Sequence, residues 1–123
     1  MADYTVSVSL ADIVRFSLPA KSEFVAGDEP LSRQIRWTVI AGLPLRRDAL
    51  LERDDLVIAA ERSDQPGWDR AMRQFVDLRV GAVVVNCDVP ISTLEIASAA
   101  GLPVVRVPAT SNLRDIHRGV LTL

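Results

Sequence analysis

The sequence predicts an α/β fold: a single domain with a mostly parallel sheet flanked by short helices. Short runs rich in β-branched residues, such as residues 81–86 and 102–107, are typical of strands covered on both faces. Helical patterns separate these runs, as expected when parallel strands are joined by crossover connections. No repeat, low-complexity tract or linker interrupts residues 1–123, so we expect one domain.

The first half of the chain is predicted to begin with a short helix. Residues 1–8 are interpreted as a lead-in or a short edge strand, and Ser9 can cap a helix that ends before Pro19. Residues 22–26 are predicted as a strand, followed by a turn at 27–30. Residues 34–40 alternate apolar and polar side chains, which indicates a half-buried strand with Trp37 in the core. Residues 45–52 can form a turn or two of helix, and residues 56–60 are predicted as an inner strand.

The second half is predicted to alternate helices and strands. Pro66 stands near the start of a helix whose apolar residues recur at helical spacing. Ser92 and Glu95 form a capping-box pattern at the next helix start, and Gly101 can end that helix in a left-handed conformation. Residues 110–112 precede a last helix with one apolar face. Packing side chains are expected at Trp68, Ala71, Met72, Phe75, Val76, Leu113, Ile116 and Val120.

Composition excludes several classes of function. The formal net charge is −2 and the pI is near 5.3, so the domain lacks the excess of Lys and Arg that a nucleic-acid surface needs. One cysteine, Cys87, and one histidine, His117, provide neither an internal disulfide nor a zinc-type ligand cluster, and we expect no cofactor. No segment resembles a leader or a membrane span, so we expect a cytoplasmic protein that does not contact membranes.

Polar residues follow the predicted parallel strands, where the carboxyl ends of strands usually meet ligands. A small polar effector could be held there. The alternative is that these side chains only cap helices and shape turns. The predicted ligand-binding residues are Glu61, Arg62, Asn86, Asp88, Thr110, Ser111 and Asn112.

Three other groups have simpler structural interpretations. A nucleophilic Cys87 would need a base such as His117, but we interpret Cys87 as a packing residue and His117 as lying at the rim of the last helix. Asp48, Asp54 and Asp55 are interpreted as turn residues rather than metal ligands. A basic group could meet an anion, although a solvated face is the simpler account. It consists of Arg33, Arg36, Arg46 and Arg47.

Taken in order, these segments resemble the amino-terminal domain of the purine catabolism regulator (PucR) family of bacterial transcription factors. The resemblance covers nearly the whole chain and is carried by the order and spacing of several short pieces. These are residues 8–13, 24–27, 31–37, 50–58, 80–82 and 97–105. Residues 50–58 correspond to a family segment of the type L-x-x-G-E-L-V-L-T-T-G. The fold is also similar to the amino-terminal domains of HPr kinase and of Mur ligases.

The resemblance implies a non-enzymatic regulatory domain that senses a small-molecule effector or forms a homo-oligomer. Contact with DNA is then expected only through a helix-turn-helix module absent from this chain, to which the last helix would pass a change. Two alternatives stay open. One is an accessory domain that positions a substrate or partner for an enzyme of the Mur ligase or HPr kinase type. The other is a dimerisation module without a ligand.

This chain departs from the family pattern at three places. Asp54 stands where the family commonly has glycine, and residues 59–61 replace the T-T-G end of the strand. Thr38 and Val39 stand where a histidine often follows a Trp-Val pair. If those positions line a ligand pocket, the ligand of this chain differs or is lost.

Overall fold

The computed structural model describes residues 8–27, 33–41, 51–59 and 65–122. Helices and strands alternate through most of this part of the chain. In order they are β1 (Val8–Ser9), α1 (Leu10–Phe16), β2 (Glu23–Ala26), β3 (Gln34–Ile35), β4 (Trp37–Ala41), β5 (Asp55–Ala59), α2 (Gln65–Leu78), β6 (Ala82–Val85), α3 (Ile91–Ala99), β7 (Val104–Arg106) and α4 (Leu113–Leu121). The helix expected at residues 45–52 and the turn expected at 27–30 lie mostly outside the described residues.

Five strands form one sheet in the order β2-β7-β6-β5-β4. All neighbours are parallel except β2, which pairs antiparallel with β7 at one edge. A separate pair, β1 and β3, is antiparallel. The predicted α/β class with a mostly parallel sheet is confirmed.

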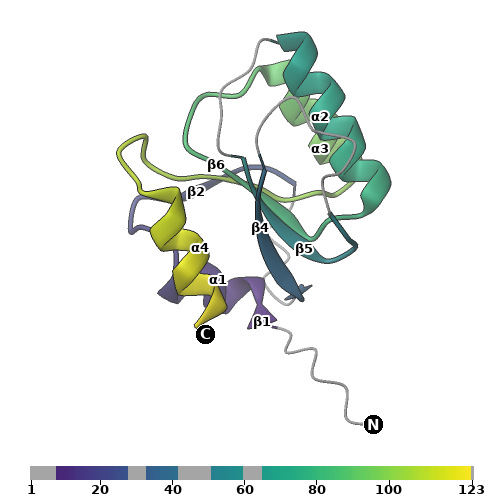
Figure 1. Ribbon diagram of the computed structural model, residues 1–123. Helices are drawn as coiled ribbons and strands as arrows, with labels where there is room; N and C mark the ends of the chain where they lie inside the picture. The colour runs from purple at the N-terminus through teal and green to yellow at the C-terminus, as the bar shows by residue number, and fades with distance from the viewer. Residues whose placement is uncertain (1–7, 28–32, 42–50, 60–64, 123) are drawn as a thin grey trace, which may run out of the picture.

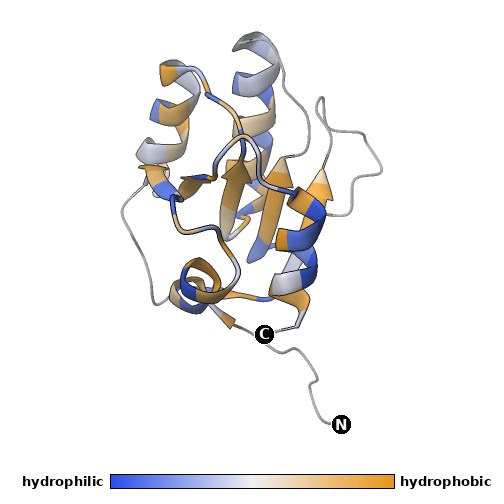
Figure 2. Cartoon of the chain, turned by 90° about the vertical axis from the view of Figure 1, so that its left-hand side faces the viewer, coloured by the Kyte–Doolittle hydropathy of each residue, from blue (hydrophilic) through white to orange (hydrophobic). Residues whose placement is uncertain are grey.

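Helices cover both faces of the sheet (Figure 1). Helices α2 and α3 lie together on one face, and α1 and α4 lie on the other. Each face has its own apolar core, with Trp68, Met72 and Phe75 of α2 in the first and Leu10, Ile13 and Ile116 in the second. The central strands β5 and β6 are therefore buried on both faces, and the sheet is hydrophobic along most of its length (Figure 2).

Several predicted helix ends are confirmed. The Ser9 side chain accepts a hydrogen bond from the Asp12 N–H at 3.2 Å, and α1 ends at Phe16, before Pro19. Gly101 takes a φ of +69° after α3, and the Leu102 N–H reaches back to the Ala97 carbonyl at 2.9 Å. Among the described helices, none is both long and apolar enough to cross a membrane.

The expectation that Trp37 lies in the core is wrong. The predicted continuous strand is interrupted at Arg36, whose N–H bonds to the Asp54 carbonyl at 3.0 Å. After this break the alternation shifts, so that Thr38 is buried while Trp37 is 58% exposed. Trp37 begins β4, which is an edge strand of the sheet.

The predicted capping role of Ser92 is also wrong. Helix α3 begins at Ile91 with Pro90 as its N-cap, and no side chain caps it. The hydroxyl groups of Ser92 and the buried Thr93 instead donate hydrogen bonds to the carboxylate of Asp69 on α2. These two side chains therefore connect α3 to α2 and do not cap the first turn of α3.

Candidate functional site

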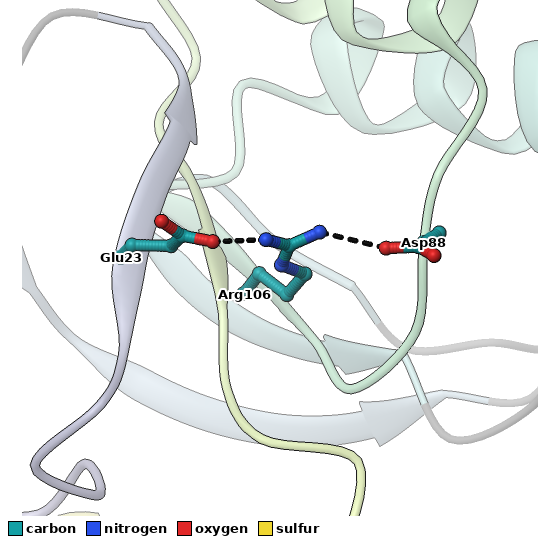
Figure 3. Close-up of polar contacts among 3 residues, drawn as sticks. All are labelled: Glu23, Asp88 and Arg106. Carbon is teal, nitrogen blue, oxygen red and sulfur yellow. Dashed lines mark hydrogen bonds and ion pairs between the residues drawn. The ribbon is translucent and has the colours of Figure 1, made fainter.

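The carboxyl edge of the sheet carries a three-residue charge bridge (Figure 3). Arg106, the last residue of β7, lies opposite Glu23, the first residue of the antiparallel strand β2. Its guanidinium donates to the Glu23 carboxylate and, at 2.7 Å, to the carboxylate of Asp88, which follows β6. One cation therefore connects three segments that are far apart in the sequence.

The bridge is open to solvent. The side chains of Glu23, Arg106 and Asp88 are 53%, 41% and 93% exposed. The hydrogen bond and the charge of Glu23, with smaller contributions from Asp88, raise the pKa of the Arg106 guanidinium, so it stays protonated. Exposed ion pairs are screened by water and salt, so this bridge adds little to stability and can exchange partners.

The other predicted site residues do not join this bridge. Asn112 caps α4, because its Oδ1 accepts from the Arg114 and Asp115 N–H groups at 3.0 and 3.3 Å. Thr110 and Ser111 lie in the turn before that cap. Asn86 is half-buried directly after β6. Glu61 and Arg62 lie outside the described residues.

Asp88 is thus the predicted residue that the structure places in a charged cluster, and Asn112 follows the alternative, structural interpretation. Glu23 and Arg106 were not among the residues predicted from the sequence. Arg106 had a signal, since it is the one charged residue within the apolar run 102–107. Glu23 had none, because only the antiparallel pairing of β2 with β7 brings it to this edge.

Cys87 and His117 occupy different elements. Cys87 is half-buried in the turn after β6. His117 lies on α4, and its Nε2–H donates to the Thr38 carbonyl of β4 at 3.1 Å. Within the described ranges, no three His, Cys, Asp or Glu side chains are grouped so that they could hold a metal ion.

The acidic pair at the start of β5 has a structural role: Asp54 lies in the preceding turn, as expected, but Asp55 is the first residue of the strand. Asp55 is buried, and its Oδ2 accepts from the Glu52 N–H at 2.9 Å. Burial raises the pKa of the Asp55 carboxyl above its ordinary value of 3.8; the charge of Arg36 opposes this shift and that of Asp54 adds to it. Arg36 itself pairs with Glu52 on the surface. Asp48, Arg46 and Arg47 lie outside the described residues.

The fold is similar to that of a solved regulatory region. The crystal structure of the CBS and DRTGG domains of the regulatory region of Clostridium perfringens pyrophosphatase, complexed with the activator diadenosine tetraphosphate, superposes with a TM-score of 0.65. The identity is 16%, and the match covers 92% of this chain but 46% of that one. At this identity the likeness concerns the fold alone.

No curated protein matches the sequence. A protein family does match it, over residues 12–123, which include every described helix and strand except β1 and the first residues of α1. This match agrees with the resemblance found in the sequence and favours a regulator over an accessory domain of an enzyme. The chain belongs to the purine catabolism regulatory protein-like family, PucR.

Proposed function

We propose that this chain is a non-enzymatic, effector-sensing domain of a PucR-like transcription regulator, and that a small anionic effector binds at the carboxyl edge of its sheet. The observation that carries the proposal is the bridge of Arg106 with Glu23 and Asp88. Membership of a regulatory protein family supports it. So does the fold neighbour, a pyrophosphatase regulatory region whose structure holds a nucleotide activator.

The bridge couples effector binding to the conformation of the segment between β6 and α3. Asp88 lies in the segment between β6 and α3, and its contact with Arg106 ties this segment to β7. A carboxylate or phosphate that replaces Asp88 on the guanidinium would free that segment. Such an effector shifts the conformational equilibrium only if it binds the conformation in which Asp88 is released from Arg106 more tightly than the conformation in which the two residues are paired.

A thermal-shift screen tests this proposal. The purified domain is heated with purines, nucleotides, amino acids and allantoin-pathway intermediates, and a true effector should raise the melting temperature with concentration. Asp88→Asn removes the competing carboxylate and should strengthen the response to an anionic effector. Asp77→Asn, on the exposed outer side of α2, is the matched control and should not change it.

A screen without any hit would refute effector sensing by this domain. A hit whose response is unchanged in Asp88→Asn would place the effector away from the bridge. A hit that Asp88→Asn weakens would mean that Asp88 contacts the effector directly, which contradicts the displacement step.

Self-association through β4 is a second candidate, favoured by one observation. Trp37 and Ile40 are 58% and 36% exposed on this edge strand, and strand edges with exposed apolar side chains tend to pair with other chains. If β4 forms a dimer, Trp37→Arg should reduce the mass measured by light scattering to that of a monomer. Ile91→Ser, which removes a 75% exposed side chain at the start of α3, should leave the dimer intact. A native protein that stays monomeric at high concentration excludes this candidate.

A further inference from the structure

A concave surface lies at the opposite end of the strands, where the parallel strands begin. It is a cleft of about 470 Å³. Its lining comes from residues just before β3, β5, β6 and β7 and from the ends of α2 and α3. Clefts of this size hold small molecules.

Positive charge dominates this cleft. Three arginines line it, Arg33, Arg53 and Arg79, against one carboxylate, Asp54. Within the described part of the chain none of the three arginines forms an ion pair. This is a local excess of two positive charges in a chain whose net charge is −2.

One of these arginines is held in place by the fold. The Arg33 guanidinium donates to the Gly81 and Gly101 carbonyl groups, each at 3.4 Å. These carbonyls lie before β6 and after α3, so Arg33 spans the turns that border the cleft. Behind the charges the wall is apolar and includes Phe75 and Leu102.

The backbone at the cleft is also unusual. Asp54 and Arg79 have φ angles of +67° and +58°, and they are the only non-glycine residues with positive φ in the described ranges. The Asp54 N–H donates to the Arg79 carbonyl at 3.1 Å, so the two left-handed residues are joined directly. Residues in such conformations are costly and concentrate at functional sites.

We propose that this cleft binds a small organic oxyanion, a phosphate monoester or a dicarboxylate. Arg53 and Arg79 bind its oxygen atoms, and the apolar wall contacts its carbon skeleton. Guanidinium groups suit both kinds of oxyanion because their planar N–H donors match pairs of oxygen atoms. This site is separate from the carboxyl edge and does not depend on the effector proposed there.

Titrations of the domain, followed by amide NMR shifts, test the proposal. The probes are phenyl phosphate and phthalate, which share an aromatic ring, and uncharged benzamide as the control ligand. We expect saturable shifts at Asp54, Arg79 and Val80 with one or both anions and none with benzamide. The tighter of the two anions then identifies the kind of oxyanion.

Four variants locate the binding. Arg53→Ala and Arg79→Ala should each weaken it by about tenfold, the loss expected for one charge-assisted hydrogen bond of ~1.4 kcal/mol. Asp54→Asn should tighten it by roughly threefold to tenfold, because it removes the one carboxylate while asparagine tolerates positive φ. Arg118→Ala, in the last turn of α4 on the other face of the sheet, is the matched control and should have no effect.

The proposal is overturned if neither anion saturates the domain, if benzamide binds as well as they do, or if Arg118→Ala weakens binding as much as Arg79→Ala. Melting temperatures of the variants show that each is folded. Asp88→Asn should leave these titrations unchanged, so failure at this cleft and failure at the carboxyl edge can be told apart.

Discussion

Replacing Arg79 with glycine should stabilise the domain. Helix α2 ends at Leu78, and Arg79 follows it in the left-handed region with a φ of +58°. The Arg79 N–H bonds to the Val76 carbonyl at 3.1 Å and the Val80 N–H to the Phe75 carbonyl at 3.3 Å, a helix end at which glycine is the preferred residue.

The size of the effect follows from two opposing contributions. The left-handed conformation costs an L-residue about 1–2 kcal/mol, which Arg79→Gly removes. Glycine also gives the unfolded chain more freedom, which takes back about 0.5–1 kcal/mol. The net gain in unfolding free energy is therefore about 0.5–1 kcal/mol, or roughly 2–5 °C in melting temperature for a domain of this size.

Urea unfolding measures this gain, with the fluorescence of the buried Trp68 on α2 as the signal. Arg79→Ala is the control, because it removes the same charge and side chain but keeps Cβ. Gly101→Ala is the reverse experiment: φ is +69° there and a new Cβ would meet no atom within 4 Å, so it should lose about 1 kcal/mol from backbone strain alone. If Arg79→Gly is no more stable than Arg79→Ala, the strain argument is refuted. Arg79→Gly should also weaken oxyanion binding, as Arg79→Ala does, so stability and binding would change in opposite directions.

Three further substitutions test contacts of buried or capping groups. Because burial raises the pKa of Asp55, the folded state binds this proton more tightly than the unfolded state. The free energy of unfolding of Asp55→Asn should therefore exceed that of the native protein most at pH 7, and the difference should shrink as the pH falls toward 3.8. Urea unfolding at both pH values measures this difference. Asn112→Ala should lower the free energy of unfolding by about 1 kcal/mol because it removes the cap of α4. Ser111→Ala should change the free energy of unfolding by less than about 0.5 kcal/mol. Asp69→Ala should cost about 1–3 kcal/mol in chemical denaturation, because it leaves the buried Thr93 hydroxyl without its acceptor.

Features that depend on local sequence were predictable. The runs that became β5, β6 and β7 are apolar on both faces because helices cover both sides of the sheet, and that need is visible in the residue types. The starts of α1 and α4 were predictable because an N-capping side chain acts within three residues of itself.

Features that depend on contacts between distant segments were not predictable. The interruption at Arg36 is set by its bond to Asp54, and it changed the exposure of Trp37. Ser92 satisfies a capping pattern, yet Asp69 on a neighbouring helix provides another partner for its hydroxyl. In both cases a tertiary contact overrode a local preference.

The two candidate sites have the same origin. Arg106 meets Glu23, 83 residues away in the sequence, because β2 returns antiparallel beside β7. Arg33 reaches carbonyl groups 48 and 68 residues away. The order of the strands in the sheet determines which of these residues come into contact, and residue types alone do not reveal that order.

The hydrogen bond from His117 to the Thr38 carbonyl links the last helix to the free edge of the sheet. One backbone acceptor of β4 is thereby already in use, so an incoming strand must either pair nearer to Ile40 or compete with the imidazole. If a second copy docks along β4, the competition would loosen α4. Dimerisation and the displacement of α4 would then be coupled, because both depend on whether the His117 imidazole keeps its hydrogen bond to the Thr38 carbonyl.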